Sequence, residues 1–181
     1  MLNSKRKFFI AILFLFLSVL FVNFSEAADN KNRNIFELFT NSNPSLKDKT
    51  AKSYIEIITS ACKKYNQDPY VIAGIIVHES TVNNKAVGGN NYGLMQINWP
   101  AHKKLITNYF PKVKKAKDLF DAKTNIFYGT KVFADCMSRS DSIKGGLLLY
   151  SGGSEKLASK VLKTLKELQA KDTDKKTRKG K

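Results

Sequence analysis

Glu79 is the residue whose setting in the sequence best suits acid–base chemistry. It is the only carboxylate between Pro69 and Lys117, and a helix starting at Pro69 would place three isoleucines on its face, at spacings of three, four and seven residues. Burial and the negative end of the helix dipole would both raise its pKa. The sequence therefore predicts a carboxyl that holds a proton near neutral pH, as a general acid requires. The alternative is a glutamate at a helix end that is exposed to water.

Two helices are predicted before and around this glutamate. Ser45 and Asp48 have the spacing of a capping box and would start the first helix. Asp68 followed by Pro69 would start the second helix, which should run to about Glu79. The apolar face of the first helix consists of Tyr54, Ile55, Ile58, Ala61, Cys62 and Tyr65.

The polar stretch 83–98 cannot hold a long helix, because it contains several asparagines, a Gly88-Gly89 pair and Gly93. It is predicted to be a loop that shapes a site. Helical periodicity returns at residues 126–137 and 157–168, and no stretch shows convincing strand alternation. The predicted fold class is all-α, a helical bundle with one long loop rich in glycine and asparagine.

The first 27 residues have the pattern of a secretory signal peptide. Three cations precede an apolar run and a small-residue site, so cleavage after Ala27 is predicted, with an uncleaved anchor as the alternative. The remaining chain divides into an N-terminal arm or short helix (28–44), a globular domain (45–170) and a basic disordered tail (171–181). We therefore expect an exported monomer, periplasmic or associated with the cell wall, with no membrane span after cleavage.

The formal net charge of +16 favours polyanionic partners. For an exported protein these are cell-wall polymers or anionic lipid, and the lysines lack the arginine-rich clustering typical of nucleic-acid recognition. The alternative is a solvated lysine surface with no specific partner.

The two cysteines, Cys62 and Cys136, form an even set in a chain expected to reach an oxidising compartment. A disulfide between them is predicted. The alternative is a pair of buried free thiols that pack as small apolar side chains.

Four motifs follow one another along the chain. They are His78-Glu79-Ser80, Tyr92-Gly93-Leu94-Met95-Gln96-Ile97-Asn98, Asn125-Ile126 with Gly129, and Leu149-Tyr150-Ser151-Gly152-Gly153. In order and spacing they resemble the signatures of family 1 lytic transglycosylases, the SLT catalytic domain, whose fold is lysozyme-like. Ser151 departs from the asparagine usual there, and residues 87–92 replace a serine-bearing segment. The chain thus resembles small accessory enzymes that open the wall for secretion or conjugation machines.

The resemblance implies a reaction on peptidoglycan glycan strands that uses one acid, with no metal and no cofactor. Glu79 would protonate the oxygen between N-acetylmuramic acid (MurNAc) and N-acetylglucosamine (GlcNAc), then take a proton from the muramic 6-hydroxyl to close a 1,6-anhydro ring. Glycoside hydrolases usually need a second carboxylate. Asp68 is predicted to be occupied as a helix cap, and Asp118 and Asp121 precede a later helix.

Supporting roles fall on Ser80, Gly93, Met95, Gln96, Asn98, Asn125 and Tyr150. Gly93 would let the backbone approach the sugar, Met95 would pack against it, and the amides of Gln96, Asn98 and Asn125 would offer polar contacts. Tyr150 would hydrogen-bond to Glu79 and orient it. The alternatives are a helix-end cap for Ser80 and core positions for Met95 and Tyr150.

Two other functions stay open at this point. A hydrolytic muramidase would use a positioned water or a second carboxylate. A non-catalytic module for wall binding or secretion-system assembly would use the basic surface and the tail. His78 is not predicted to take part, because adjacent helical residues point about 100° apart.

Overall fold

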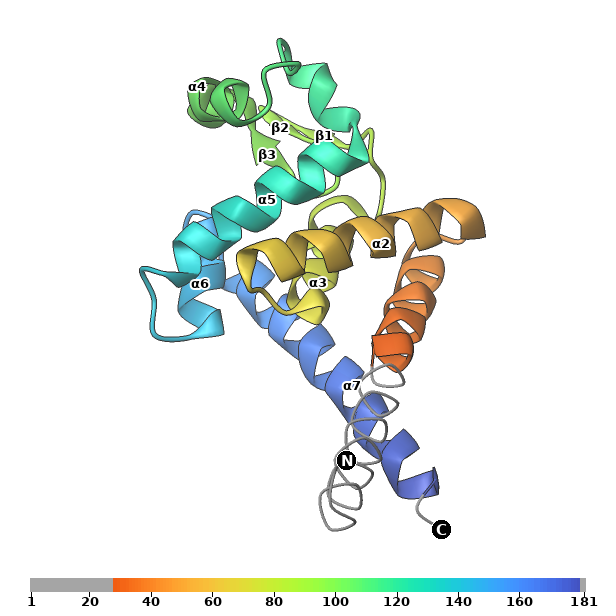
Figure 1. The fold of residues 1–181 in the computed structure, drawn as a ribbon. Helices are drawn as coiled ribbons and strands as arrows, with labels where there is room; N and C mark the ends of the chain where they lie inside the picture. Colours follow the sequence, from red (N-terminus) through yellow and green to blue (C-terminus); the bar gives the residue numbers. More distant parts are fainter. Residues whose placement is uncertain (1–27, 180–181) are drawn as a thin grey trace, which may run out of the picture.

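The computed structural model describes residues 28–179, with side chains to residue 174, so the predicted signal peptide lies outside the described residues. The fold is all-α, as predicted, with one very small sheet (Figure 1). The helices are α2 (Asp48–Tyr65), α3 (Pro69–Ser80), α4 (Trp99–Tyr109), α5 (Ala122–Met137), α6 (Ile143–Tyr150) and α7 (Glu155–Lys179), with a 3-10 helix η1 (Ala116–Phe120). The strands are β1 (Val87–Gly88), β2 (Asn91–Tyr92) and β3 (Ile97–Asn98).

Helix α3 is the central element, packed against α2 and α7. Eight of its twelve residues are buried, which is why its sequence is apolar on all sides. Asp68 caps the helix by accepting a hydrogen bond from the Tyr70 backbone N–H at 2.9 Å, and Pro69 occupies the first turn. Gly74 permits close packing, since a Cβ there would lie 3.1 Å from Cγ1 of Val161 on α7. The helix predicted from Asp68-Pro69 is confirmed.

The start of α2 differs from the prediction. The helix begins at Asp48 after Lys47, which provides no side-chain cap. The hydroxyl of Ser45 instead donates to Oδ1 of Asn43 at 2.7 Å, and the Ser45 backbone N–H donates to the same atom at 3.2 Å. The predicted capping box is therefore wrong, because a local turn centred on Asn43 uses the serine.

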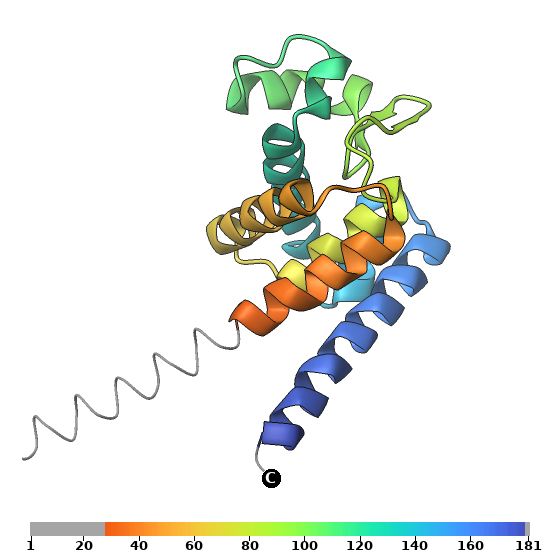
Figure 2. The same cartoon turned by 90° about the vertical axis from the view of Figure 1, so that its right-hand side faces the viewer.

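The two ends of the described chain are held by the core. Residues 28–42 form a helix whose Ile35 and Phe39 are fully buried. Helix α7 is the long helix along one side of the molecule and continues to Lys179 (Figure 2), so a disordered tail from residue 171 is wrong. Asp172 on α7 accepts hydrogen bonds from the side chains of Tyr70 and Asn34, at 2.9 and 2.8 Å. These contacts pin α7 to the start of α3 and to the helix 28–42.

The loop predicted at 83–98 contains the small sheet. Its strands are antiparallel in the order β1-β2-β3, and Tyr92 pairs with Val87 on one side and Ile97 on the other. Strands of two residues are too short for an alternating pattern to appear in sequence. The loop is thus ordered by backbone pairing rather than by helices.

Cys62 on α2 and Cys136 on α5 are both buried free thiols, so the predicted disulfide is not formed. Burial raises the pKa of both, that of Cys62 to about 12. Each thiol is accommodated as a small apolar side chain, which was the alternative interpretation.

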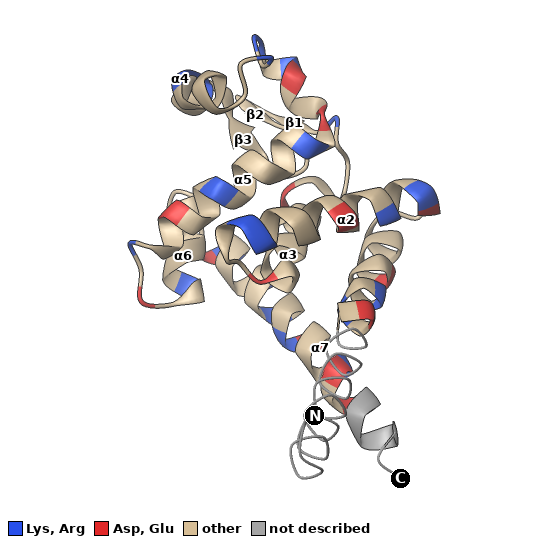
Figure 3. Ribbon diagram, in the orientation of Figure 1, with Lys and Arg blue, Asp and Glu red and all other residues tan. Residues whose placement is uncertain are grey.

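Lysines and arginines lie on every labelled helix except α3 (Figure 3). Among the described residues, no helix is both long enough and apolar enough to cross a membrane.

Candidate active site

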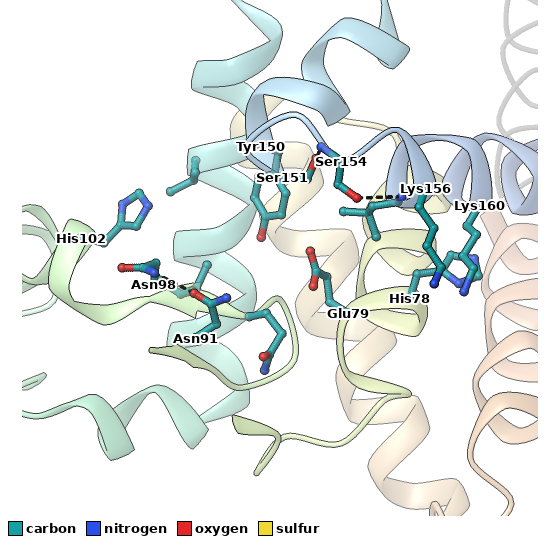
Figure 4. A pocket seen from close by; sticks show the side chains of 15 residues that line it. His78, Glu79, Asn91, Asn98, His102, Tyr150, Ser151, Ser154, Lys156 and Lys160 are labelled. Atoms are coloured by element: carbon teal, nitrogen blue, oxygen red, sulfur yellow. Dashed lines mark hydrogen bonds between the residues drawn. The ribbon is translucent and has the colours of Figure 1, made fainter. Parts of the chain in front are cut away.

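A cleft of about 670 Å³ lies where the end of α3, the small sheet and the start of α7 meet. Glu79, in the last turn of α3, lines it together with Gln96 and Asn98 from the loop and Tyr150 from α6 (Figure 4). These residues come from three of the four sequence motifs. The fold therefore gathers into one cleft side chains that are more than seventy residues apart in sequence.

Among the described residues, Glu79 is the only acidic one that lines this cleft. Its side chain points into the cleft, between Tyr150 on one side and His78 on the other (Figure 4). Burial raises the pKa of Glu79 to about 7. Within residues 28–174, no side chain forms a hydrogen bond or ion pair with its carboxyl group. The group can thus carry a proton near neutral pH and is unpaired, which leaves it available to a ligand.

Asn125, on α5, holds the loop 83–98 by hydrogen bonds and does not line the cleft. Its side chain is fully buried, accepts a hydrogen bond from the Met95 backbone N–H at 2.8 Å, and donates to the carbonyl oxygens of Tyr92 and Leu119, each at 2.9 Å. Gly93 has φ +80°, and a Cβ there would collide with Asn125 Nδ2 and the Leu119 carbonyl oxygen. The structure therefore places Asn125 and Gly93 where they seat the loop on α5 and not in the cleft lining, and their predicted sugar contacts stay predictions.

Met95 and Ser80 also serve the core. Met95 is fully buried, and its side chain fills the space that a side chain at Gly129 would need. The Ser80 hydroxyl is buried and donates back to the Ile76 carbonyl oxygen at 2.9 Å. This burial agrees with the core and helix-end alternatives for Met95 and Ser80, and their predicted contacts with substrate stay predictions.

Tyr150 lies beside Glu79 but does not hydrogen-bond to it. Its hydroxyl donates to the Met95 carbonyl oxygen at 2.7 Å, and its ring packs edge-on against Phe133, 6.0 Å between centroids. The pKa of Tyr150 is raised, mainly because the side chain is buried and to a smaller extent because the Glu79 charge is near. The expected hydrogen bond to Glu79 is thus not formed, and the Tyr150 hydroxyl instead joins α6 to the loop at Met95.

Gln96 and Asn98 line the cleft, although both also hold the loop together. Gln96 has a left-handed backbone with φ 47°, and its Nε2 donates to the carbonyl oxygens of Gly93 and Ala86 at 2.9 and 3.2 Å. Asn98 caps α4 through Ala101 N–H at 3.1 Å. Their predicted contacts with substrate stay predictions.

Sequence reasoning missed several residues that line the cleft, namely His78, Asn91, His102, Lys156 and Lys160. Adjacent helical residues point about 100° apart, yet His78 and Glu79 both line the cleft, because the cleft is wide enough to include both. Nε2 of His78 lies 2.9 Å from the Thr164 hydroxyl on α7, and burial is the main cause that lowers the pKa of His78. Lys156 and Lys160 stand four residues apart just after the last motif, so they share one helix face. This spacing is the sequence signal that could have identified them as cleft residues.

Comparison with known proteins places the chain in a family. The family model of the transglycosylase SLT domain matches residues 56–175, so the chain belongs to this family and the resemblance seen in the four motifs is confirmed. A transglycosylase of Enterobacteria phage PRD1 is 30% identical over 106 residues, which are 58% of this chain and 36% of the phage protein. The chain thus matches little more than a third of that relative's length. No solved structure matches the chain significantly.

Proposed function

We propose that this protein is a lytic transglycosylase that cleaves the β-1,4 bond between MurNAc and GlcNAc in peptidoglycan and leaves a 1,6-anhydro end. The observation that carries the proposal is Glu79 in the cleft, with a pKa raised to about 7 and no second carboxylate beside it among residues 28–174. Family membership supports the reaction class.

In the proposed mechanism the same carboxyl group acts twice. Protonated Glu79 gives its proton to the glycosidic oxygen as the bond to the anomeric carbon breaks, and the substrate's N-acetyl group stabilises the developing positive charge. The Glu79 carboxylate then accepts the proton of the muramic 6-hydroxyl while that oxygen bonds to the anomeric carbon. A pKa close to neutrality suits both steps, because each protonation state is readily reached.

Hydrolysis by a muramidase is the alternative that the cleft favours less. Retaining and inverting glycoside hydrolases both use a second carboxylate. It acts as a nucleophile in the retaining enzymes and activates water in the inverting ones. No such group lines the cleft in the part of the chain that the structure describes.

The test is the mass of the products released from purified sacculi. Anhydro-muropeptides are expected from the parent, and reducing ends that incorporate labelled water would instead indicate a muramidase. Glu79→Gln keeps the shape of the side chain and should lower the rate by about 10²- to 10⁴-fold. Glu56→Gln, on the exposed side of α2, is the matched control and should act like the parent.

Two outcomes would count against the proposal. A Glu79→Gln variant that clears sacculi at the parent rate would remove this residue from the reaction. A parent that shows no turnover would favour a non-catalytic module that binds the wall.

We also propose that the protein acts outside the cytoplasmic membrane, where peptidoglycan lies, and that it opens the wall locally for a secretion or conjugation apparatus. Fractionation with N-terminal sequencing should find a mature chain that starts at Ala28. A chain retained in the cytoplasm with Met1 would contradict export.

A further inference from the structure

The cleft has a cationic side. Lys156 and Lys160, from the first turns of α7, line it, and Figure 4 shows both side chains near His78, on one side of Glu79. Lys160 is close enough to His78 to contribute to the lowered pKa of that imidazole. The positive charge at this end therefore belongs to the lysines, while the histidine tends to stay neutral.

On the opposite side of Glu79, the described residues that line the cleft carry no formal charge. Their polar side chains include Asn91, Asn98 and His102 (Figure 4). Burial lowers the pKa of His102, which favours the neutral ring. The two ends of one cleft thus present different chemistry to a ligand that runs through it.

Helix stability does not account for the paired lysines. Lys156 and Lys160 stand four residues apart, where like charges on a helix repel. Neither forms an ion pair with any carboxylate of residues 28–174, whereas Lys163, on the same helix, pairs with Glu167. Both lysines are exposed, so their charges are available to an anionic ligand.

The proposed substrate supplies anions at this position. N-acetylated sugars are uncharged, but each muramic residue carries a peptide stem through its lactyl group, and the stem bears several carboxylates. A strand cut at Glu79 places a muramic residue, and therefore a stem, next to the acid. We propose that Lys156 and Lys160 form a subsite for the carboxylates of this peptide stem, an inference that rests on the proposed function.

The lysines should select substrate rather than take part in bond cleavage. Burial is the cause of the raised pKa of Glu79. Removing their charges should therefore raise KM and leave kcat, and the pH at which kcat changes, as in the parent.

The test compares two double variants on two substrates. Lys156→Gln/Lys160→Gln removes the paired charges, and Lys163→Gln/Lys166→Gln removes the same net charge from exposed positions of α7 outside the cleft. Glycan strands with intact stems are compared with strands stripped of stems by an amidase. We expect the first variant to lose about tenfold in kcat/KM on strands with stems and less than twofold on stripped strands. The control pair should lose less than twofold on both.

Two results would overturn the subsite. Stripped strands keep a free lactyl carboxylate, so an equal loss on both substrates would assign the lysines to the glycan itself. A loss of equal size in the control pair would indicate general attraction by net charge.

Binding separates failure of the subsite from failure of the proposed function. In the Glu79→Gln background, titration calorimetry with a muropeptide that bears a stem reports affinity without turnover. Weaker binding after loss of Lys156 and Lys160 would support the subsite even if the parent enzyme were inactive. Unchanged binding would refute the subsite while leaving the proposed reaction intact.

Discussion

Replacing Asn125 with alanine should detach the loop from α5. The buried amide accepts one hydrogen bond from the Met95 N–H at 2.8 Å and donates two, to the Tyr92 and Leu119 carbonyl oxygens, each at 2.9 Å. Alanine removes all three and leaves at least two buried backbone groups, the Met95 N–H and the Leu119 carbonyl, without partners. At about 1–3 kcal/mol for each of these two groups, the free energy of unfolding should fall by about 2–6 kcal/mol.

Urea unfolding is the assay, with a lower midpoint and an unchanged m-value as the expected result. Asn84→Ala is the matched control, because that side chain donates a single hydrogen bond, at 2.9 Å, to the Phe120 carbonyl oxygen and is partly exposed. It should cost about 1 kcal/mol. Turnover by the folded Asn125→Ala protein should also fall, since the loop carries the cleft residues Gln96 and Asn98. A midpoint shift no larger than that of Asn84→Ala, with full activity, would refute this reasoning.

Three further predictions concern other groups. Burial raises the folded-state pKa of Glu79 from 4.5 to about 7, so its ionisation costs stability progressively over that range. Glu79→Gln should therefore leave the free energy of unfolding nearly unchanged at about pH 4 and raise it by about 2 kcal/mol at about pH 8. This gain is smaller than the full pKa shift would give, because the carboxyl group is partly exposed. Equal effects at both pH values would contradict this prediction. Gly93→Ala should destabilise the fold far more than Gly89→Ala, because both glycines have positive φ but only the first meets neighbouring atoms. Comparable melting temperatures for the two variants would argue against the loop packing. Cys62 and Cys136 should resist a thiol reagent in the native protein and react as two free thiols after unfolding. An intact mass that shows the two cysteines joined as a disulfide would contradict the buried-thiol structure.

Several features followed from the sequence because they depend on local chemistry. Asp68 and Pro69 cap a helix through atoms one or two residues away, so their role is visible in the sequence itself. The isolation of Glu79 from other acids is likewise a property of the chain, and it agrees with the acid-free surroundings of this residue in the cleft. The local capping pattern was misleading at Ser45, because a turn at Asn43 uses the serine hydroxyl that a capping box would need.

Tertiary structure alone decided which motif residues face the cleft and which support it. Met95 stands in a motif beside the cleft residues Gln96 and Asn98, yet it faces the core and its backbone N–H pairs with the Asn125 side chain, thirty residues away in sequence. A buried amide and a cleft amide look the same in a sequence, since residue type and spacing do not report which side of the loop is covered. Asp172 illustrates the same limit, because its partners Tyr70 and Asn34 lie about a hundred or more residues away in sequence and no local pattern announces these hydrogen bonds. The sequence by itself determined the isolation of Glu79 from other acids and the family motifs, whereas long-range hydrogen bonding and packing determined the shape and charge of the cleft around them.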